Sequence, residues 1–184
     1  MANDRDLHAV RGVLKGDRSA MADLYHRHAG YLAATCSRYV GSDEAVRDIL
    51  QTSFLKIFSS MGRFEYRGAG SLRAWMNRIV INESLKYLRE ECRMQSLPED
   101  YEREPDGPED ADVSEIPETD LLEMIRALPD GYRTVFNLYV LEEKSHREIA
   151  SMLGISEGTS ASQLHRAKSM LASMIREYRK EHFQ

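Results

Sequence analysis

The sequence has little of what marks secreted, membrane-spanning or metal-binding proteins. Its two cysteines, Cys36 and Cys92, are far apart and belong to no CxxC or Cys/His cluster, so we expect neither a zinc site nor a disulfide framework. No apolar run approaches the roughly 20 residues that a membrane-spanning helix needs. The charged residues 1–6 are not followed by the apolar segment of a signal peptide. We therefore expect a cytoplasmic chain that is not inserted in a membrane.

Sequence motifs of catalysis are also missing. The six histidines and thirty carboxylates include no HExxH spacing, and the chain has no nucleophile elbow and no glycine-rich phosphate loop. His26 and His28 are two residues apart, which places them on different faces of a helix. We therefore expect no enzyme activity, no metal site and no cofactor.

Prolines are few, and four of the five lie in one acidic segment. Residues 98–120 contain eleven acidic residues and one basic residue, Arg103, so this segment carries a net charge of −10. The rest of the chain carries +5, although the whole chain carries −5. Because prolines block helix propagation and like charges repel, we predict that residues 95–118 form a flexible linker.

On both sides of this linker, apolar residues recur at the three- and four-residue spacing of amphipathic helices. The upstream pattern predicts four helices. Gly41 and Ser42 interrupt it after the second helix, residues 63–70 form a loop, and Ser71 can cap the fourth helix. Strict two-residue alternation is absent, so no strand is predicted. The fold class that follows is all-α, with two small helical domains.

Residues 145–171 show the pattern of a helix-turn-helix. Ser145 and Glu148 have the spacing of a capping box, which predicts the start of a helix. Gly154 tolerates the left-handed backbone of a tight turn, and Ala150 is small enough for two helices to cross closely there. Ile155 fills the corner, and a second helix follows from about residue 157.

The second helix presents a polar and basic face, and no acidic residue follows Glu157 on it. Such a face suits a helix that lies in the major groove of DNA. We assign Arg166 and Lys168 to phosphates, and Ser162 and His165 to base edges. The complete set of candidate contacts is Thr159, Ser160, Ala161, Ser162, His165, Arg166 and Lys168, although the helical spacing also places Ser160 on the buried face. An ordinary helical hairpin with a solvated polar face is the alternative interpretation.

The sequence around this motif resembles the extracytoplasmic-function (ECF) sigma factors of the sigma-70 family. The resemblance to their region 4 lies in residues 128–139 (LPDGYRTVFNLY), 145–150 (SHREIA) and 153–160 (LGISEGTS). The resemblance to their region 2 lies in residues 48–58 (DILQTSFLKIF) and 75–82 (WMNRIVIN). The family order implies a region 2 domain at residues 1–94, the acidic linker at 95–118 and a region 4 helix-turn-helix domain at 119–184.

The resemblance also implies roles for residues. The first region 2 segment corresponds to a helix that docks on a coiled coil of the largest polymerase subunit, which implies core polymerase contacts at Asp48, Gln51, Thr52 and Leu55. The next helix and its preceding loop correspond to the part of the family that melts and reads the minus-ten promoter element, which implies DNA contacts at Arg63, Phe64, Tyr66, Arg67, Arg73, Arg78, Asn82, Lys86 and Arg89. We expect Trp75 in the core and Asn82 on the buried, apolar side of its helix. Ala161 replaces a residue that is often basic or polar in relatives, so we expect either weaker binding of the minus-thirty-five element or a preference for thymine methyls.

The function that the resemblance implies is that of a sigma factor, which directs core RNA polymerase to specific promoters and supports promoter melting and transcription initiation. Its expected partners are core RNA polymerase, promoter DNA and an anti-sigma protein that is often membrane-linked, and we expect the chain to be a monomer. The acidic linker would be either a plain tether or a mimic of nucleic acid. One alternative is a helix-turn-helix regulator that binds duplex DNA as a dimer without polymerase. Another is a helical scaffold that binds only proteins.

Overall fold

The computed structural model describes residues 2–91 and 115–182, with side chains for residues 5–90 and 115–182. Within these ranges every regular element is a helix, and the chain divides into two compact units. The prediction of an all-α fold is therefore confirmed for the described residues.

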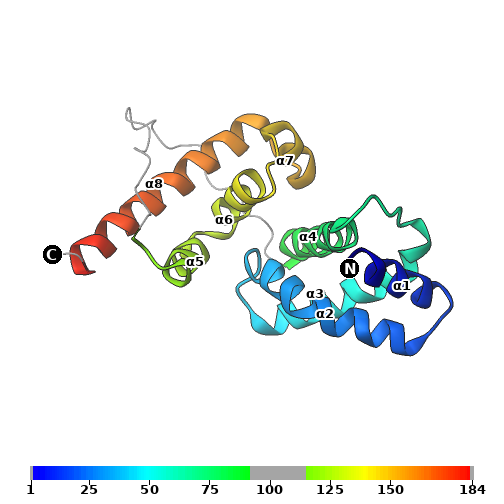
Figure 1. The fold of residues 1–184 in the computed structure, drawn as a ribbon. Helices are drawn as coiled ribbons and strands as arrows, with labels where there is room; N and C mark the ends of the chain where they lie inside the picture. The colour runs from blue at the N-terminus through cyan, green and yellow to red at the C-terminus, as the bar shows by residue number, and fades with distance from the viewer. Residues whose placement is uncertain (1, 92–114, 183–184) are drawn as a thin grey trace. The chain divides into compact units, whose positions relative to one another are not determined.

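The first unit contains four α-helices and a short 3-10 turn, which are α1 (Ala2–Leu14), α2 (Arg18–Ser37), α3 (Asp43–Ser60), η1 (Met61–Arg63) and α4 (Ser71–Glu91). Helix α2 packs against α1, α3 and α4, and α3 packs against α4, as Figure 1 shows. The Asp17 carboxylate caps α2 by accepting a hydrogen bond of 2.8 Å from the Ser19 N–H, and the Ser42 hydroxyl caps α3. The break predicted at Gly41 and Ser42 is thus confirmed.

The core of the first unit is apolar, with fully buried side chains at Leu24, Leu32, Ile57, Leu72, Met76 and Val80. Cys36 lies in this core as a free thiol, and its Sγ is 3.3 Å from the hydroxyl oxygen of Ser84. Burial raises the pKa of the Cys36 thiol, so the thiol stays protonated and unreactive near neutral pH. Cys92 lies outside the described residues.

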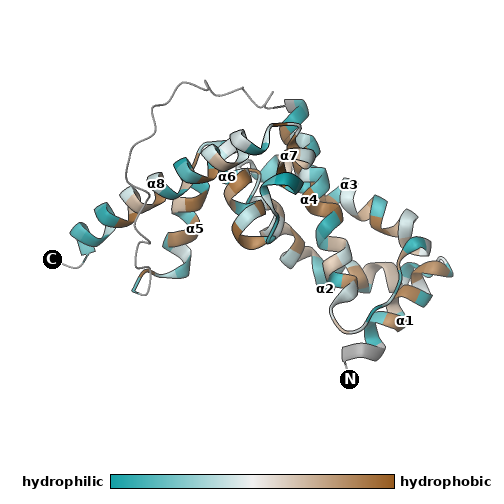
Figure 2. Cartoon of the chain, turned by 90° about the horizontal axis from the view of Figure 1, so that it is seen from above, coloured by the Kyte–Doolittle hydropathy of each residue, from teal (hydrophilic) through white to brown (hydrophobic). Residues whose placement is uncertain are grey.

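The second unit contains α5 (Glu118–Ala127), α6 (Asp130–Phe136), the π-helical turn η2 (Asn137–Leu141), α7 (His146–Leu153) and α8 (Glu157–His182). Helix α8 is 26 residues long and packs against α5, α6 and α7. Its core side chains include Leu128, Val135, Leu138, Ile149 and Ala167. Figure 2 shows hydrophobic and hydrophilic residues alternating along α8, as an amphipathic helix requires.

Residues 95–114 of the predicted acidic linker, which spans residues 95–118, lie outside the described residues. Its last four residues are described, and there Ile116 is buried and Glu118 begins α5. Residues 115–118 of the predicted linker are therefore ordered next to α5. Arg179 near the end of α8 pairs with Glu115 at 3.9 Å, and the Tyr178 hydroxyl donates a hydrogen bond of 2.6 Å to Asp120. These contacts hold the beginning of the second unit against the carboxyl end of α8.

Candidate nucleic-acid interface

A capping box and a left-handed glycine define the two ends of α7. The Ser145 hydroxyl accepts a hydrogen bond of 3.3 Å from the Glu148 N–H, and the Glu148 carboxylate accepts one of 2.9 Å from the Ser145 N–H. These bonds, the backbone one above all, lower the pKa of the Glu148 carboxyl. Gly154 ends the helix at φ 71° and its N–H donates to the Ala150 carbonyl at 2.9 Å. Both predicted features of the turn are confirmed.

The crossing of α7 and α8 combines apolar contact with one polar bond. Ile149 and Leu164 are buried on the facing sides of the two helices, and Ala150 is 9 % exposed. Ser160 of α8 is fully buried, and its hydroxyl lies 2.9 Å from Nδ1 of His146, the first residue of α7. The crossing is therefore specified by a directional hydrogen bond as well as by shape.

The outer face of α8 is exposed where the sequence predicts DNA contacts. Ala161, Ser162, His165 and Lys168 are all exposed, and Thr159 is half-buried, with its backbone N–H bonded to the Ser156 hydroxyl at 2.9 Å. The next acidic residue along the helix after Glu157 is Glu177, so this face carries no negative charge for five turns. The face can therefore approach phosphates without repulsion.

Two predicted contacts of α8 differ from this pattern. Ser160 has no exposed surface and bonds to His146, so it supports the turn and cannot touch DNA, which corrects its assignment as a DNA-binding residue. Arg166 is half-buried, and its Nη1 donates a hydrogen bond of 3.2 Å to the hydroxyl of Tyr132 on α6. The role of Tyr132 could not be predicted from the sequence, because a contact across 34 residues leaves no local periodic signal.

In the first unit, the loop before α4 gathers the predicted aromatic residues. The rings of Phe64 and Trp75 pack with their centroids 5.3 Å apart, and both side chains are half-buried. Trp75 was expected in the core, but it is only half-buried and packs against Phe64. Tyr66 is half-buried in the same loop, and Arg67 is exposed and pairs with Glu65 at 2.9 Å. The loop therefore offers ring faces beside a cation.

Helix α4 carries an exposed basic stripe, which we define as Arg78, Asn82, Lys86 and Arg89. Their spacing of four, four and three residues places them on one face of the helix. Asn82 is exposed between Arg78 and Lys86, so the expectation that it is buried on the apolar side was wrong. Arg63 is exposed at the end of η1, and the guanidinium of Arg73 stacks over the Tyr31 ring at 4.9 Å.

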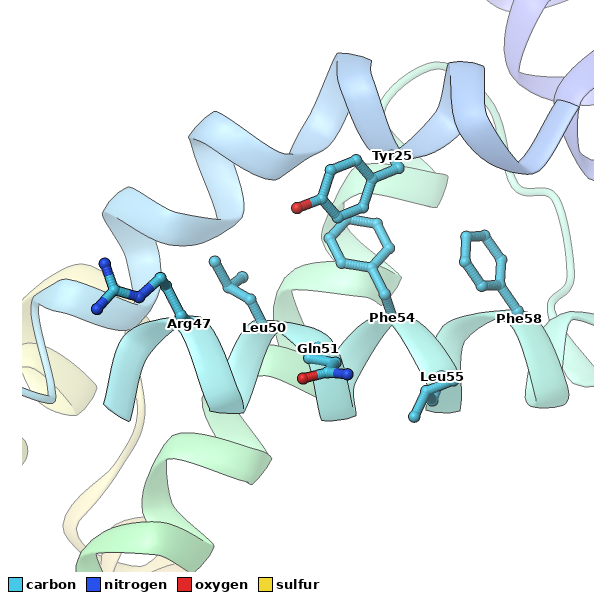
Figure 3. Close-up of a pocket in the computed structure, with 7 residues that line it drawn as sticks. All are labelled: Tyr25, Arg47, Leu50, Gln51, Phe54, Leu55 and Phe58. Atoms are coloured by element: carbon cyan, nitrogen blue, oxygen red, sulfur yellow. The ribbon is translucent and has the colours of Figure 1, made fainter. Parts of the chain in front are cut away.

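The predicted polymerase-binding residues lie together on the outer face of α3. Asp48, Gln51, Thr52 and Leu55 are all exposed, and Leu55 is 66 % exposed. Beside them is an open hollow of about 410 Å³ between α2 and α3, lined by Tyr25, Arg47, Leu50, Gln51, Phe54, Leu55 and Phe58. Figure 3 shows the rings of Tyr25 and Phe54 side by side in this hollow, where their centroids are 4.6 Å apart. The position of Tyr25 in this hollow could not be predicted from the sequence, because the hollow depends on how α2 packs on α3.

In the two described ranges, no group of three or more His, Cys, Asp or Glu side chains is arranged to hold a metal ion. None of the described helices is both long and apolar enough to cross a membrane.

Comparison with known proteins relates both units to transcription factors. Residues 24–94 match the family model of sigma-70 region 2, and residues 118–171 match that of sigma-70 region 4. The ECF RNA polymerase sigma factor SigE of Mycolicibacterium smegmatis is 30% identical in an alignment of 176 residues that covers 90% of this chain and 66% of SigE. The ECF RNA polymerase sigma-E factor of Haemophilus influenzae is 30% identical in an alignment of 178 residues that covers 90% of this chain and 93% of that protein. Among solved structures, the sigma factor RpoE in complex with the anti-sigma factor NepR from Bartonella quintana has 20% identity and a TM-score of 0.49, covering 84% of this chain and 97% of that chain.

The two family models occur in the chain in the same order as the two units, one in each. The Haemophilus relative is matched over nearly its whole length. The chain therefore belongs to the ECF RNA polymerase sigma factors, a family of DNA-binding transcription initiation factors.

Proposed function

We propose that this chain directs core RNA polymerase to promoters through three surfaces, one for core polymerase and two for separate promoter elements. The observation that carries the proposal is that each unit matches one sigma region and also exposes a cationic helix face. The first unit offers the basic stripe of α4, and the second offers the outer face of α8. Separate compact units suit promoter elements that are separated along the DNA.

The outer face of α8 is our candidate for reading duplex DNA at the minus-thirty-five element. The turn of the helix-turn-helix leaves one face of the first half of α8 exposed, and the exposed side chains after Glu157 there are small, polar or basic. Lys168 and Arg166 supply charge for phosphates, and Ser162 and His165 supply hydrogen-bonding groups for base edges. The methyl group of Ala161 lies on the same exposed face and can contact a thymine methyl.

The α4 stripe and the loop before it are our candidate for the melted minus-ten element. Arg78, Lys86 and Arg89 can follow a phosphate backbone, with Asn82 between them able to hydrogen-bond a base. The half-buried rings of Phe64 and Trp75 lie near the start of α4, where an unpaired base can stack. Stacking on aromatic side chains contributes about 1–3 kcal/mol per base, enough to favour a flipped strand once the duplex opens.

The outer face of α3 is our candidate for docking on core polymerase. Leu55 is exposed beside the polar side chains of Asp48, Gln51 and Thr52, which is the composition of an apolar anchor with a polar rim. A helix of the partner could bury Leu55 against the neighbouring hollow between α2 and α3. We also propose that the chain works as a cytoplasmic monomer, and that an anti-sigma protein holds it inactive, as is common in this family.

The proposal is tested by reconstitution with core polymerase and by sequencing the transcripts that the complex initiates. We expect specific initiation with core polymerase present, and weak, unspecific DNA binding by the chain alone. Symmetric duplex binding by the isolated chain as a dimer would instead support a helix-turn-helix regulator. A chain that binds proteins but ignores DNA in both conditions would support a scaffold.

A further inference from the structure

The corner between α5 and α6 is fixed by a buried arginine. Arg133 of α6 is 6 % exposed, and its Nη1 donates hydrogen bonds to the carbonyl of Arg126 at 2.9 Å and to that of Leu128 at 3.1 Å. Its Nη2 pairs with the carboxylate of Asp130 in the same turn. These bonds satisfy carbonyls at the carboxyl end of α5, which have no partner within their own helix. The first turn of α6 therefore has one well-defined position relative to α5.

Tyr132 is the neighbour of this arginine in the fixed turn. Its side chain is half-buried and packs against the apolar cluster that Ile125 and Leu128 form with Ala167 and Leu171 of α8. Packing on one side of the ring and the rigid corner behind it restrict the Tyr132 side chain. Its hydroxyl group is thereby held at the surface of α8.

The hydroxyl of Tyr132 accepts the hydrogen bond from Nη1 of Arg166, at 3.2 Å and in a partly buried setting. Arg166 follows His165 directly and lies one turn after Ser162, so it borders the outer face of α8. An arginine side chain has many rotamers, and binding a phosphate normally requires that it lose this freedom. A guanidinium has five N–H donors, so the bond to Tyr132 does not by itself prevent the group from binding a phosphate.

We infer that Tyr132 is a positioning residue for DNA binding, which orders the Arg166 guanidinium at the edge of the α8 face before DNA arrives. The inference rests on the proposed function of α8 and adds a residue outside the helix-turn-helix to it. Tyr132 contacts no DNA in this mechanism. It acts through Arg166 alone, by reducing the conformational entropy that Arg166 loses on binding.

The test is a double-mutant cycle in reconstituted holoenzyme with the variants Tyr132→Phe, Arg166→Ala and both together. The probe is a fluorescent duplex of the promoter fragment that the wild-type holoenzyme selects in the transcript-sequencing experiment, titrated at several salt concentrations. We expect Tyr132→Phe to weaken binding about three- to tenfold. The phenylalanine ring keeps the packing, so the melting temperature should stay close to that of wild type. Tyr139→Phe, a partly exposed tyrosine on η2 that stacks on His146, is the matched control and should leave affinity unchanged.

The double variant separates positioning from structural support. If Tyr132 acts through Arg166, the double variant binds as weakly as Arg166→Ala and no weaker, and the salt slope of Arg166→Ala is not reduced further. Equal losses from Tyr132→Phe in both backgrounds, or unchanged or tighter binding of Tyr132→Phe, would overturn the inference while leaving the proposed function intact. Full affinity of Arg166→Ala would overturn both the inference and the assignment of Arg166 to phosphate.

Discussion

Replacing Arg133 by methionine should strongly destabilise the second unit. The substitution keeps an apolar stem of similar length but removes the donors to the carbonyls of Arg126 and Leu128 and the partner of Asp130. Hydrogen bonds from a charged group contribute about 1.5–3 kcal/mol each. Part of this loss is offset because the buried guanidinium no longer has to be desolvated, and because Asp130 is 45 % exposed and can be rehydrated. We therefore expect a net loss of about 3 kcal/mol in the free energy of unfolding.

Amide hydrogen exchange of the whole chain, resolved by mass spectrometry, measures this loss within one unit. A loss of about 3 kcal/mol corresponds to exchange that is faster by roughly a hundredfold at the slowest amides of α6 and α8. The amides of α2, α3 and α4 belong to the other unit and should keep their rates. Arg126→Met is the matched control, because its side chain is 47 % exposed and forms a surface pair with Glu123, which contributes little. An acceleration below about threefold for Arg133→Met would refute the reasoning.

Three further outcomes are expected. Leu55→Arg should abolish pull-down of core polymerase without changing the helical circular dichroism. The control Leu14→Arg, at a leucine that is 57 % exposed on α1, should leave pull-down intact. Equal retention of core polymerase by both variants would contradict the α3 assignment. Arg166→Glu should weaken holoenzyme binding to duplex minus-thirty-five DNA and lower its salt slope by about one or more, and unchanged slopes would refute the phosphate contact. The pKa of Glu148 is lowered in the folded chain, so its cap stabilises α7 fully above the ordinary glutamate pKa and less as the pH falls through the lowered value. The free energy of urea unfolding of the second unit should therefore fall more on acidification in wild type than in Glu148→Gln. Parallel curves of this free energy against pH would contradict the expectation.

The features that sequence could predict are local ones. The capping box of Ser145 and Glu148 and the left-handed Gly154 each depend on residues within one turn of the chain, so their spacing was sufficient. The exposed face of α3 was also predictable, since the buried residues of α3 recur at regular helical intervals. In these places the local pattern and the tertiary packing agree.

The errors arose where packing between distant helices decides the outcome. In α4 the buried side runs through Leu72, Met76, Val80, Ser84 and Leu88, and it includes a serine that bonds to Cys36 of α2. Reading the phase of the helix from Ile79, which is only half-buried, placed Asn82 on the wrong side. The helical spacing did place Ser160 on the buried face, and its listing as a DNA contact was wrong because His146 of another helix gives its hydroxyl a partner there. The burial of Arg133 could not be predicted from the sequence. Arginine is almost never fully buried unless its donors are paired, and no sequence pattern showed that they are paired here.

The length of α8 links the two ends of the second unit mechanically. The helix spans about 39 Å at 1.5 Å per residue, and the sequence has no proline or glycine after Gly158 at which it could bend sharply. The turns that we propose for DNA contact and the turns that carry Tyr178 against Asp120 are therefore parts of one rod. A tilt of about five degrees at one end moves the other end by about 3 Å, roughly the length of a hydrogen bond. A partner that tilted α8 by displacing α5 would therefore also move the outer face at the other end of the helix.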